Sequence, residues 1–214
     1  MLTVSVRTPF PGHTMPTALF NGRDLVGWTI ITAGRTTLVG LPPFDVRDGL
    51  IVCTGDPQGY LATDNEYADY TLVVEYRYPP GTQKANSGVL IHCGKTNRVR
   101  PHSIEVQMRA GRAGDLLPNP DDAGSLSRSG INPARLDPAD KGKRRHMRME
   151  PAGKNAEKPV GEWNRLEIVC RGSDLRVSLN GAKVNEATGG DLTRGRIALQ
   201  SEGSAVEFRR VELV

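Results

Sequence analysis

The segment 103–109 carries an acid, an amide and a guanidinium group at every second position. Side chains alternate between the two faces of a strand, so Glu105, Gln107 and Arg109 share one face while apolar residues occupy the other. A positioned carboxylate can accept or donate a proton, and amide and guanidinium groups bind oxygen-rich ligands. We therefore predict Glu105 as a catalytic acid or base, with Gln107 and Arg109 as ligand-binding residues. An ordinary solvent-facing strand gives the same alternation.

The segment 86–93 adds two polar groups if it forms a neighbouring strand of the same sheet. With its apolar residues directed to the core, Asn86 and His92 point outward and Gly88 leaves space between them. We predict His92 as a second catalytic candidate and Asn86 as a ligand-binding residue, although a histidine at such a position is often an ordinary surface residue. The apolar residues expected to point inward are Val89, Ile91 and Cys93.

Together these two strands predict a polar cleft suited to a sugar, whose many hydroxyls need amide, acid and guanidinium partners. We expect at least three of the four residues named below to line it, with Arg109 or Lys158 at its rim. A register slip or a β-bulge would scatter them. The four residues are Asn86, His92, Glu105 and Gln107.

The sequence lacks the motifs of several other enzyme classes. Its four histidines include no HExxH pair and no Cys/His spacing of a zinc site, so we predict no metal. There is no nucleophile elbow and no phosphate-binding glycine loop, and we predict no cofactor. Trp163 can stack on a sugar ring or anchor the start of a strand.

Two tight turns and a regular alternation of apolar residues indicate β-structure. An Asp-Gly pair at 48–49 and an Asn-Gly pair at 180–181 each separate two apolar runs, which is typical of a hairpin with a type I′ turn. Residues 70–78 alternate apolar and polar with one exception, as a half-buried strand does. Further strands are expected at 87–93, 102–109, 163–170, 196–200 and 205–213.

These elements predict an all-β fold in which two antiparallel sheets pack face to face as a sandwich. Residues 19–214 should form a single domain after a flexible lead at 1–18, with a long loop insertion at 110–157. Three widely spaced cysteines in apolar runs predict buried free thiols. The residues expected between the sheets are Ile104, Val106, Leu166, Ile168, Val177, Leu179, Ile197 and Leu199.

The net charge of +4 is confined to one part of the chain, since residues 109–158 hold eleven Lys and Arg against seven Asp and Glu. The basic run 141–148 has no interleaved aromatic residues, so we predict no nucleic-acid partner and interpret the run as a solvated loop or strand. Residues 1–15 contain no apolar segment of a signal peptide or membrane span, and we predict no membrane association.

Eight motifs occur in the order found in the 3-keto-disaccharide hydrolase family, which the sequence resembles over residues 19–214. The first is LFNGRDLVGW at 19–28, and the longest of the later ones is GRIALQSEG at 195–203. The others are NSGV at 86–89, IEVQ at 104–107, AGD at 113–115, KPVGEWN at 158–164, LNG at 179–181 and VEFR at 206–209.

The resemblance implies a concanavalin A-like jelly-roll sandwich and a hydrolase that cleaves glycosides oxidised at C3. A C3 ketone acidifies the C2 hydrogen, so a base can eliminate the C1 substituent before water adds. Glu105 is our candidate for that base, and Lys158 joins the ligand-binding candidates. Members of the family often continue the IEVQ strand with Ile-Leu-Asp, whereas Met108 and Arg109 follow here, which leaves the role of that aspartate and the choice of substrate open.

A non-catalytic carbohydrate-binding module is the alternative, because lectins share this architecture. A pocket closed over Glu105 would favour an enzyme, and a flat face lined with aromatic residues would favour a lectin. The resemblance is compatible with a bacterial periplasmic or extracellular location. The sequence does not define the compartment, the oligomeric state or the glycosidic linkage.

Overall fold

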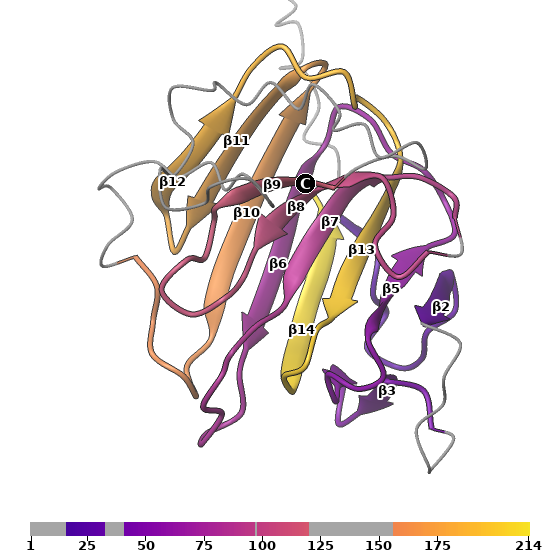
Figure 1. Ribbon diagram of the computed structural model, residues 1–214, viewed down its shortest axis with the longest axis vertical. Helices are drawn as coiled ribbons and strands as arrows, with labels where there is room; N and C mark the ends of the chain where they lie inside the picture. The colour runs from indigo at the N-terminus through magenta and orange to yellow at the C-terminus, as the bar shows by residue number, and fades with distance from the viewer. Residues whose placement is uncertain (1–15, 33–40, 97, 120–155) are drawn as a thin grey trace, which may run out of the picture.

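The computed structural model describes residues 16–32, 41–96, 98–119 and 156–214, and every regular element in these ranges is a β-strand. The strands form one eight-stranded and one six-stranded sheet, in which all strand pairs are antiparallel (Figure 1). No helix among the described residues has the length and apolar character needed to cross a membrane.

The eight-stranded sheet has the order β12 (Ala182–Ala187), β11 (Asp174–Leu179), β10 (Asn164–Arg171), β6 (Thr71–Arg77), β14 (Val206–Leu213), β4 (Leu50–Cys53) and β3 (Phe44–Arg47), and β1 (Thr17–Ala18) also pairs with β14. The six-stranded sheet has the order β2 (Trp28–Thr32), β5 (Gly59–Thr63), β13 (Arg196–Ser201), β7 (Gly88–Cys93), β8 (Ser103–Gln107) and β9 (Leu116–Asn119).

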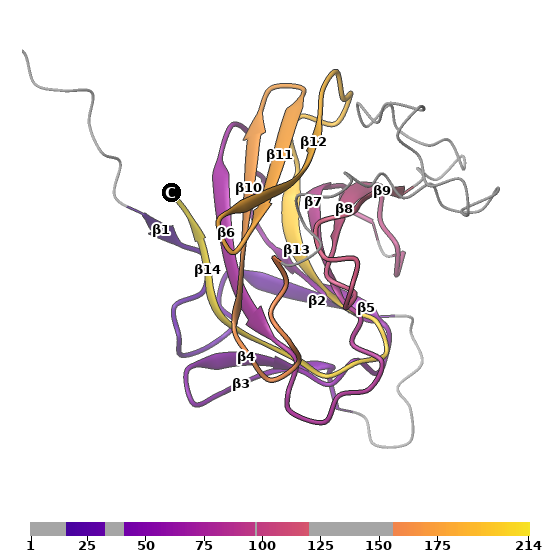
Figure 2. The same cartoon turned by 90° about the vertical axis from the view of Figure 1, so that its left-hand side faces the viewer.

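The two sheets lie face to face as the layers of a sandwich, which is clearest in the side view (Figure 2). The apolar side chains that alternate along their strands fill the space between the layers. This confirms the predicted all-β sandwich and its core. The eight predicted core residues, all at most 1% exposed, are Ile104, Val106, Leu166, Ile168, Val177, Leu179, Ile197 and Leu199.

Both predicted hairpins are present. Asp48 and Gly49 connect β3 to β4 with φ angles of 50° and 75°, and Asn180 and Gly181 connect β11 to β12 with φ angles of 49° and 85°. Positive φ at both central positions is the requirement of a type I′ turn, which residues of these types meet at low cost. The turn pairs therefore fixed both hairpins locally.

Strands also occupy parts of the segments that we expected to be irregular. Thr17 and Ala18, at the end of the predicted lead, pair with Leu213 and Glu212. Residues 116–119, in the predicted loop insertion, form β9 and pair with β8. Residues 1–15 and 120–155, which include the basic run, lie outside the described residues. All three cysteines are buried and free, as predicted.

Candidate functional site

The six-stranded sheet turns Glu105 and Gln107 to its outer face, opposite Ile104 and Val106. The alternation along β8 is regular, as the sequence predicted, and the apolar pair lies in the main core. The outer pair is buried nevertheless, since Glu105 is 0% and Gln107 4% exposed. An ordinary solvent-facing strand would leave such side chains in water, so the outer face of β8 is not an ordinary solvent-exposed face.

Two side-chain amides hold the Glu105 carboxylate. Gln107 Nε2 donates to Glu105 Oε1 at 3.2 Å, and Asn119 Nδ2 donates to Glu105 Oε2 at 3.5 Å and to Ser103 Oγ at 3.1 Å. The Gln107 amide is itself oriented, because its Oε1 accepts the backbone N–H groups of Met108 and Arg109 at 2.9 and 2.8 Å. Donors on both oxygens fix the direction of the carboxylate.

Gly88 on β7 allows the polar groups of two other strands to approach across it. A Cβ atom at this position would lie 2.9 Å from Gln200 Oε1 and 3.1 Å from Glu105 Cγ. The strand order β13-β7-β8 therefore brings Gln200 and Glu105 together over the glycine. The buried Oε1 atom of Gln200 has no hydrogen-bond partner in the described part of the chain.

Asn86 lies two residues before β7 and has the same parity as Gly88, on the outer face. Its Nδ2 donates to Glu202 Oε2 at 3.1 Å, and Glu202 Oε1 accepts from Arg100 Nη2 at 3.1 Å. Because the amide nitrogen is directed to the acid, the amide oxygen points away from it. This buried Oδ1 atom has no partner among the described residues, and it can accept a hydrogen bond from a ligand hydroxyl.

The prediction that His92 points outward and Cys93 inward is wrong, because β7 contains a bulge. Leu90 pairs with Ala198 and Cys93 with Arg196, so β7 advances three residues where β13 advances two. His92 has a φ of 52°, and the extra residue reverses the alternation beyond it. Cys93 consequently packs on the outer face with Leu90 and Ala198.

His92 is directed into the sandwich, where its ring meets the core residue Tyr70 edge-on at a centroid distance of 5.8 Å. Burial lowers the pKa of His92 below its usual value, although the Leu192 backbone and the Asp69 carboxylate act in the opposite direction. The residue is separate from the polar group around Glu105.

Arg109 and Lys158 are both exposed, and the structure places them differently. Arg109 lies two residues beyond the end of the strand that carries Glu105, and its backbone N–H donates to Gln107 Oε1. Lys158 belongs to the segment before β10, where its backbone N–H donates to Asn164 Oδ1 at 2.8 Å. Arg109 thus starts beside the polar group, whereas Lys158 is anchored to the eight-stranded sheet.

Trp163 lies on the other side of the molecule, in contact with two arginines. The guanidinium carbons of Arg77 and Arg209 are 4.7 and 4.5 Å from its ring centroid. Guanidinium groups over an indole ring form favourable cation–π contacts. The arrangement agrees with an anchoring role of Trp163 at the start of β10 rather than with a sugar platform.

Several polar residues of the outer face were not among the predicted site residues. Arg196 and Gln200 follow from the same alternation as Glu105, because the sequence already predicted Ile197 and Leu199 to be inward. Asn119 had no such signal, since it lies in the segment that was expected to be a loop. The further residues that join this face are Tyr60, Ser103 and Glu202.

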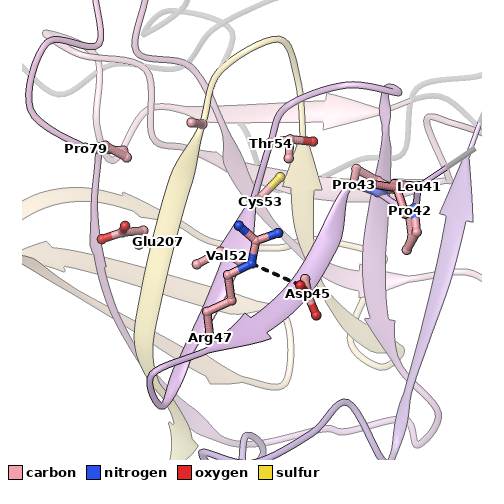
Figure 3. A pocket seen from close by; sticks show the side chains of 11 residues that line it. Leu41, Pro42, Pro43, Asp45, Arg47, Val52, Cys53, Thr54, Pro79 and Glu207 are labelled. Atoms are coloured by element: carbon pink, nitrogen blue, oxygen red, sulfur yellow. Dashed lines mark hydrogen bonds and ion pairs between the residues drawn. The ribbon is translucent and has the colours of Figure 1, made fainter. Parts of the chain in front are cut away.

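A separate hollow of about 440 Å³ lies at the β3–β4 hairpin of the eight-stranded sheet (Figure 3). Asp45 and Arg47 form an ion pair at its edge, and Glu207 stands opposite. None of the predicted site residues lines this hollow. Its lining consists of Leu41, Pro42, Pro43, Asp45, Arg47, Val52, Cys53, Thr54, Pro79, Ala205 and Glu207. Within the described ranges, no three His, Cys, Asp or Glu side chains are grouped as metal ligands would be.

Comparison with known proteins gives a family and a fold. A family model described as a 3-keto-alpha-glucoside-1,2-lyase-like domain matches residues 15–214. No curated protein matches the chain.

Solved structures with this fold include a protein from Parabacteroides distasonis ATCC 8503 that is provisionally named a glycosyl hydrolase. It is 20% identical, with a TM-score of 0.63 over 94% of this chain and 99% of that one. The carbohydrate-binding module CBM66 from Bacillus subtilis is 13% identical, with a TM-score of 0.55 over 88% and 96% of the two chains. The β-glucanase of Bacillus licheniformis is 10% identical, with a TM-score of 0.55 over 95% and 99%. At these identities the likeness shows a concanavalin A-like sandwich.

Proposed function

Since the chain belongs to the family of 3-keto-alpha-glucoside-1,2-lyase-like domains, we propose that it cleaves 3-keto-glycosides by base-assisted elimination followed by hydration. The observation that carries the proposal is the Glu105 carboxylate, which is buried on the outer face of the six-stranded sheet and held by the amides of Gln107 and Asn119. A carboxylate held in a fixed direction can accept a proton from the carbon next to a ketone.

The chemistry uses Glu105 as the base. It removes the proton from C2, the electron pair of the C–H bond forms an enolate with the C3 ketone, and the amide donors nearby stabilise the developing negative charge. The enolate then expels the C1 substituent, whose oxygen takes a proton from the protonated Glu105 or from water. Addition of water to the resulting C1–C2 double bond gives the free 3-keto-sugar, so that the net reaction is hydrolysis.

The surrounding residues supply groups for binding the sugar. The buried Oδ1 of Asn86 and Oε1 of Gln200 accept hydrogen bonds from hydroxyls. Unsatisfied polar atoms on a buried face are costly without a ligand, which supports binding of a hydroxyl-rich molecule there. Arg109, which is close in the chain to the polar residues around Glu105, remains our candidate for the rim of the cleft. Lys158 is a weaker candidate for that role, because its backbone is anchored to the other sheet.

The test is incubation of the protein with 3-keto-glucosides of several linkages, one with a chromogenic aglycone, in heavy water. We expect release of the aglycone and deuterium at C2 of the sugar beyond the exchange seen without protein, because elimination exchanges that hydrogen with solvent. Release without enzyme-dependent deuterium at C2 would contradict the elimination route. Absence of release with every linkage would contradict the enzymatic function.

A carbohydrate-binding module is the second candidate. Its support is the shared architecture with the module CBM66 of Bacillus subtilis. Calorimetric titration with the same glycosides separates the two. Saturable binding without turnover would favour the module, and turnover would exclude a purely binding role.

A further inference from the structure

Arg196 places a buried positive charge on the outer face of the six-stranded sheet. It is 7% exposed, and it shares the parity of Ala198 and Gln200 along β13. Its Nη2 donates to the backbone oxygen of Gly94 at 3.0 Å, and its buried Nε has no hydrogen-bond partner in the described part of the chain. The guanidinium also hydrogen-bonds Tyr60 and Cys93, so the capacity left over on this outer face is that of its Nε–H group.

Among the described residues, Arg196 forms no ion pair with an acid, so its positive charge has no acidic partner there. The Tyr60 phenol and the Cys93 thiol both hydrogen-bond Arg196. Burial raises the pKa of both groups to about 12, although the nearby guanidinium lowers it. Both groups are neutral at physiological pH, so the positive charge is not cancelled.

The charged residues around this end of the sheet add to the positive potential. Lys95 and Arg194 flank the site along the chain, and both are paired with the single carboxylate of Glu66, at 3.7 and 3.5 Å. Lys95, Arg194 and Glu66 therefore leave a net positive charge beside Arg196. A buried cation without an acid is expensive to maintain, and a nearby excess of positive charge increases that cost.

We propose that Arg196 binds an oxyanion group of the sugar ligand, a carboxylate or a phosphate. The inference rests on the proposed function only in that this face binds a sugar. The planar guanidinium suits both anions, because two of its N–H groups can bond two oxygens at once. A ligand anion would supply the negative charge that the described part of the protein does not provide.

The test measures binding rather than turnover. Glucuronate, glucose 6-phosphate and neutral glucose are titrated calorimetrically into the parent protein, Arg196→Met and Arg196→Lys. Arg176→Met is the control, since it removes an exposed arginine from the eight-stranded sheet. We expect at least one anionic sugar to bind the parent about tenfold or more tightly than glucose, from the strength of a charge-assisted hydrogen bond. Arg196→Met should abolish this preference, Arg196→Lys should keep part of it, and Arg176→Met should leave it intact.

Unfolding of the ligand-free variants gives the second readout. If Arg196 is kept for a ligand, Arg196→Met is as stable as the parent or more stable, because an uncompensated buried charge has been removed. Equal binding of charged and neutral sugars, a preference that survives in Arg196→Met, or failure of that variant to fold would each overturn the proposal. Preference for glucuronate identifies a carboxylate ligand, and preference for glucose 6-phosphate a phosphate. Anion binding without cleavage of 3-keto-glycosides would contradict the proposed function but support the anion site at Arg196. Cleavage of 3-keto-glycosides without a preference for anionic sugars would support the proposed function but contradict the anion site.

Discussion

The outer faces of the two sheets use charged residues in opposite ways. On the eight-stranded sheet, Arg77 pairs with Glu207 at 2.6 Å and Arg209 pairs with Glu75 at 2.6 Å, with all four side chains at least 14% exposed. On the six-stranded sheet, the Glu105 carboxylate is fully buried and is held by neutral amides. The first face is a set of compensated surface charges, and the second is a buried polar network.

The two faces differ in how far their polar groups lower the stability of the fold. Exposed ion pairs contribute little and are readily replaced. Buried polar groups reduce stability unless every atom is satisfied, yet Asn86, Arg196 and Gln200 each keep a buried polar atom without a partner among the described residues. A sheet that needed only to fold would carry apolar residues there, so the cost is consistent with a ligand-binding role for this face.

The largest expected difference between the faces is in catalysis. Glu105→Gln keeps the shape of the side chain but removes the base, so turnover of a 3-keto-glycoside should fall roughly two to four orders of magnitude. Glu207→Gln is the matched change on the other sheet and should leave the rate unchanged. Release of a chromogenic aglycone measures both, with circular dichroism to verify the fold. A folded Glu105→Gln protein that turns over at the parent rate would show that Glu105 is not the base, and a variant that does not fold would show that Glu105 has a structural role.

A second expected effect concerns the space over Gly88. In Gly88→Ala the new methyl group would meet Gln200 Oε1 at 2.9 Å and Glu105 Cγ at 3.1 Å, so we expect a loss of about 1–3 kcal/mol in unfolding free energy through overpacking. Gly94→Ala is the control, because its nearest neighbours lie at 3.7 and 4.0 Å. Urea denaturation measures the two. Equal stability of both variants would mean that the outer-face side chains move aside freely and are not held as the structure shows.

A third effect depends on pH and arises at the bulge of β7. The pKa of His92 is lowered by burial, so in mildly acidic solution the unfolded chain binds more protons than the folded one. The contribution of His92 to the unfolding free energy is fully present above the pKa of about 6.5 that it has in the unfolded chain, and it is lost as pH falls toward the lower pKa of the folded protein.

His92→Asn tests this directly, since asparagine tolerates the positive φ of 52° but does not titrate. We expect the variant to lose the part of the acid-side slope that belongs to His92, whatever its absolute stability. The measurement is the unfolding free energy from urea titrations between pH 5 and 8. An unchanged slope would show that His92 is not a buried neutral histidine.

Beyond the bulge, the alternation of residues in the sequence no longer predicts which face of the sheet a side chain lies on. Alternation gave the correct faces for Glu105 and Gln107, because β8 is regular from end to end. The same argument failed at His92, since the inserted residue depends on how β7 pairs with β13 and leaves no signal in a period-two pattern. Asn119 was missed for a related reason: an edge strand after a turn-rich segment is defined by its partner β8 rather than by its own composition.

The hairpins and the core were predictable because local rules decide them. Asp-Gly and Asn-Gly pairs specify their turns, and the apolar residues of regular strands specify the buried face. Arg196 and Gln200 could have been placed by that rule as well, from the inward positions of Ile197 and Leu199. What no local rule gives is which strands become neighbours, and the grouping of Glu105, Gly88 and Gln200 depends on that order.

The smallest effect is expected on the outer face of the eight-stranded sheet. Glu207→Gln removes the ion pair with Arg77, in which the Glu207 side chain is 21% and the Arg77 side chain 32% exposed. Because exposed ion pairs contribute little, the unfolding free energy should fall by less than about 1 kcal/mol. Arg77 keeps its contact with the Trp163 ring, which limits the loss further. The comparison is between urea midpoints at low and high salt, and the difference between parent and variant should shrink as salt screens the pair. A loss of several kcal/mol, insensitive to salt, would mean that this face too contains buried charge, and the contrast between the two sheets would no longer hold.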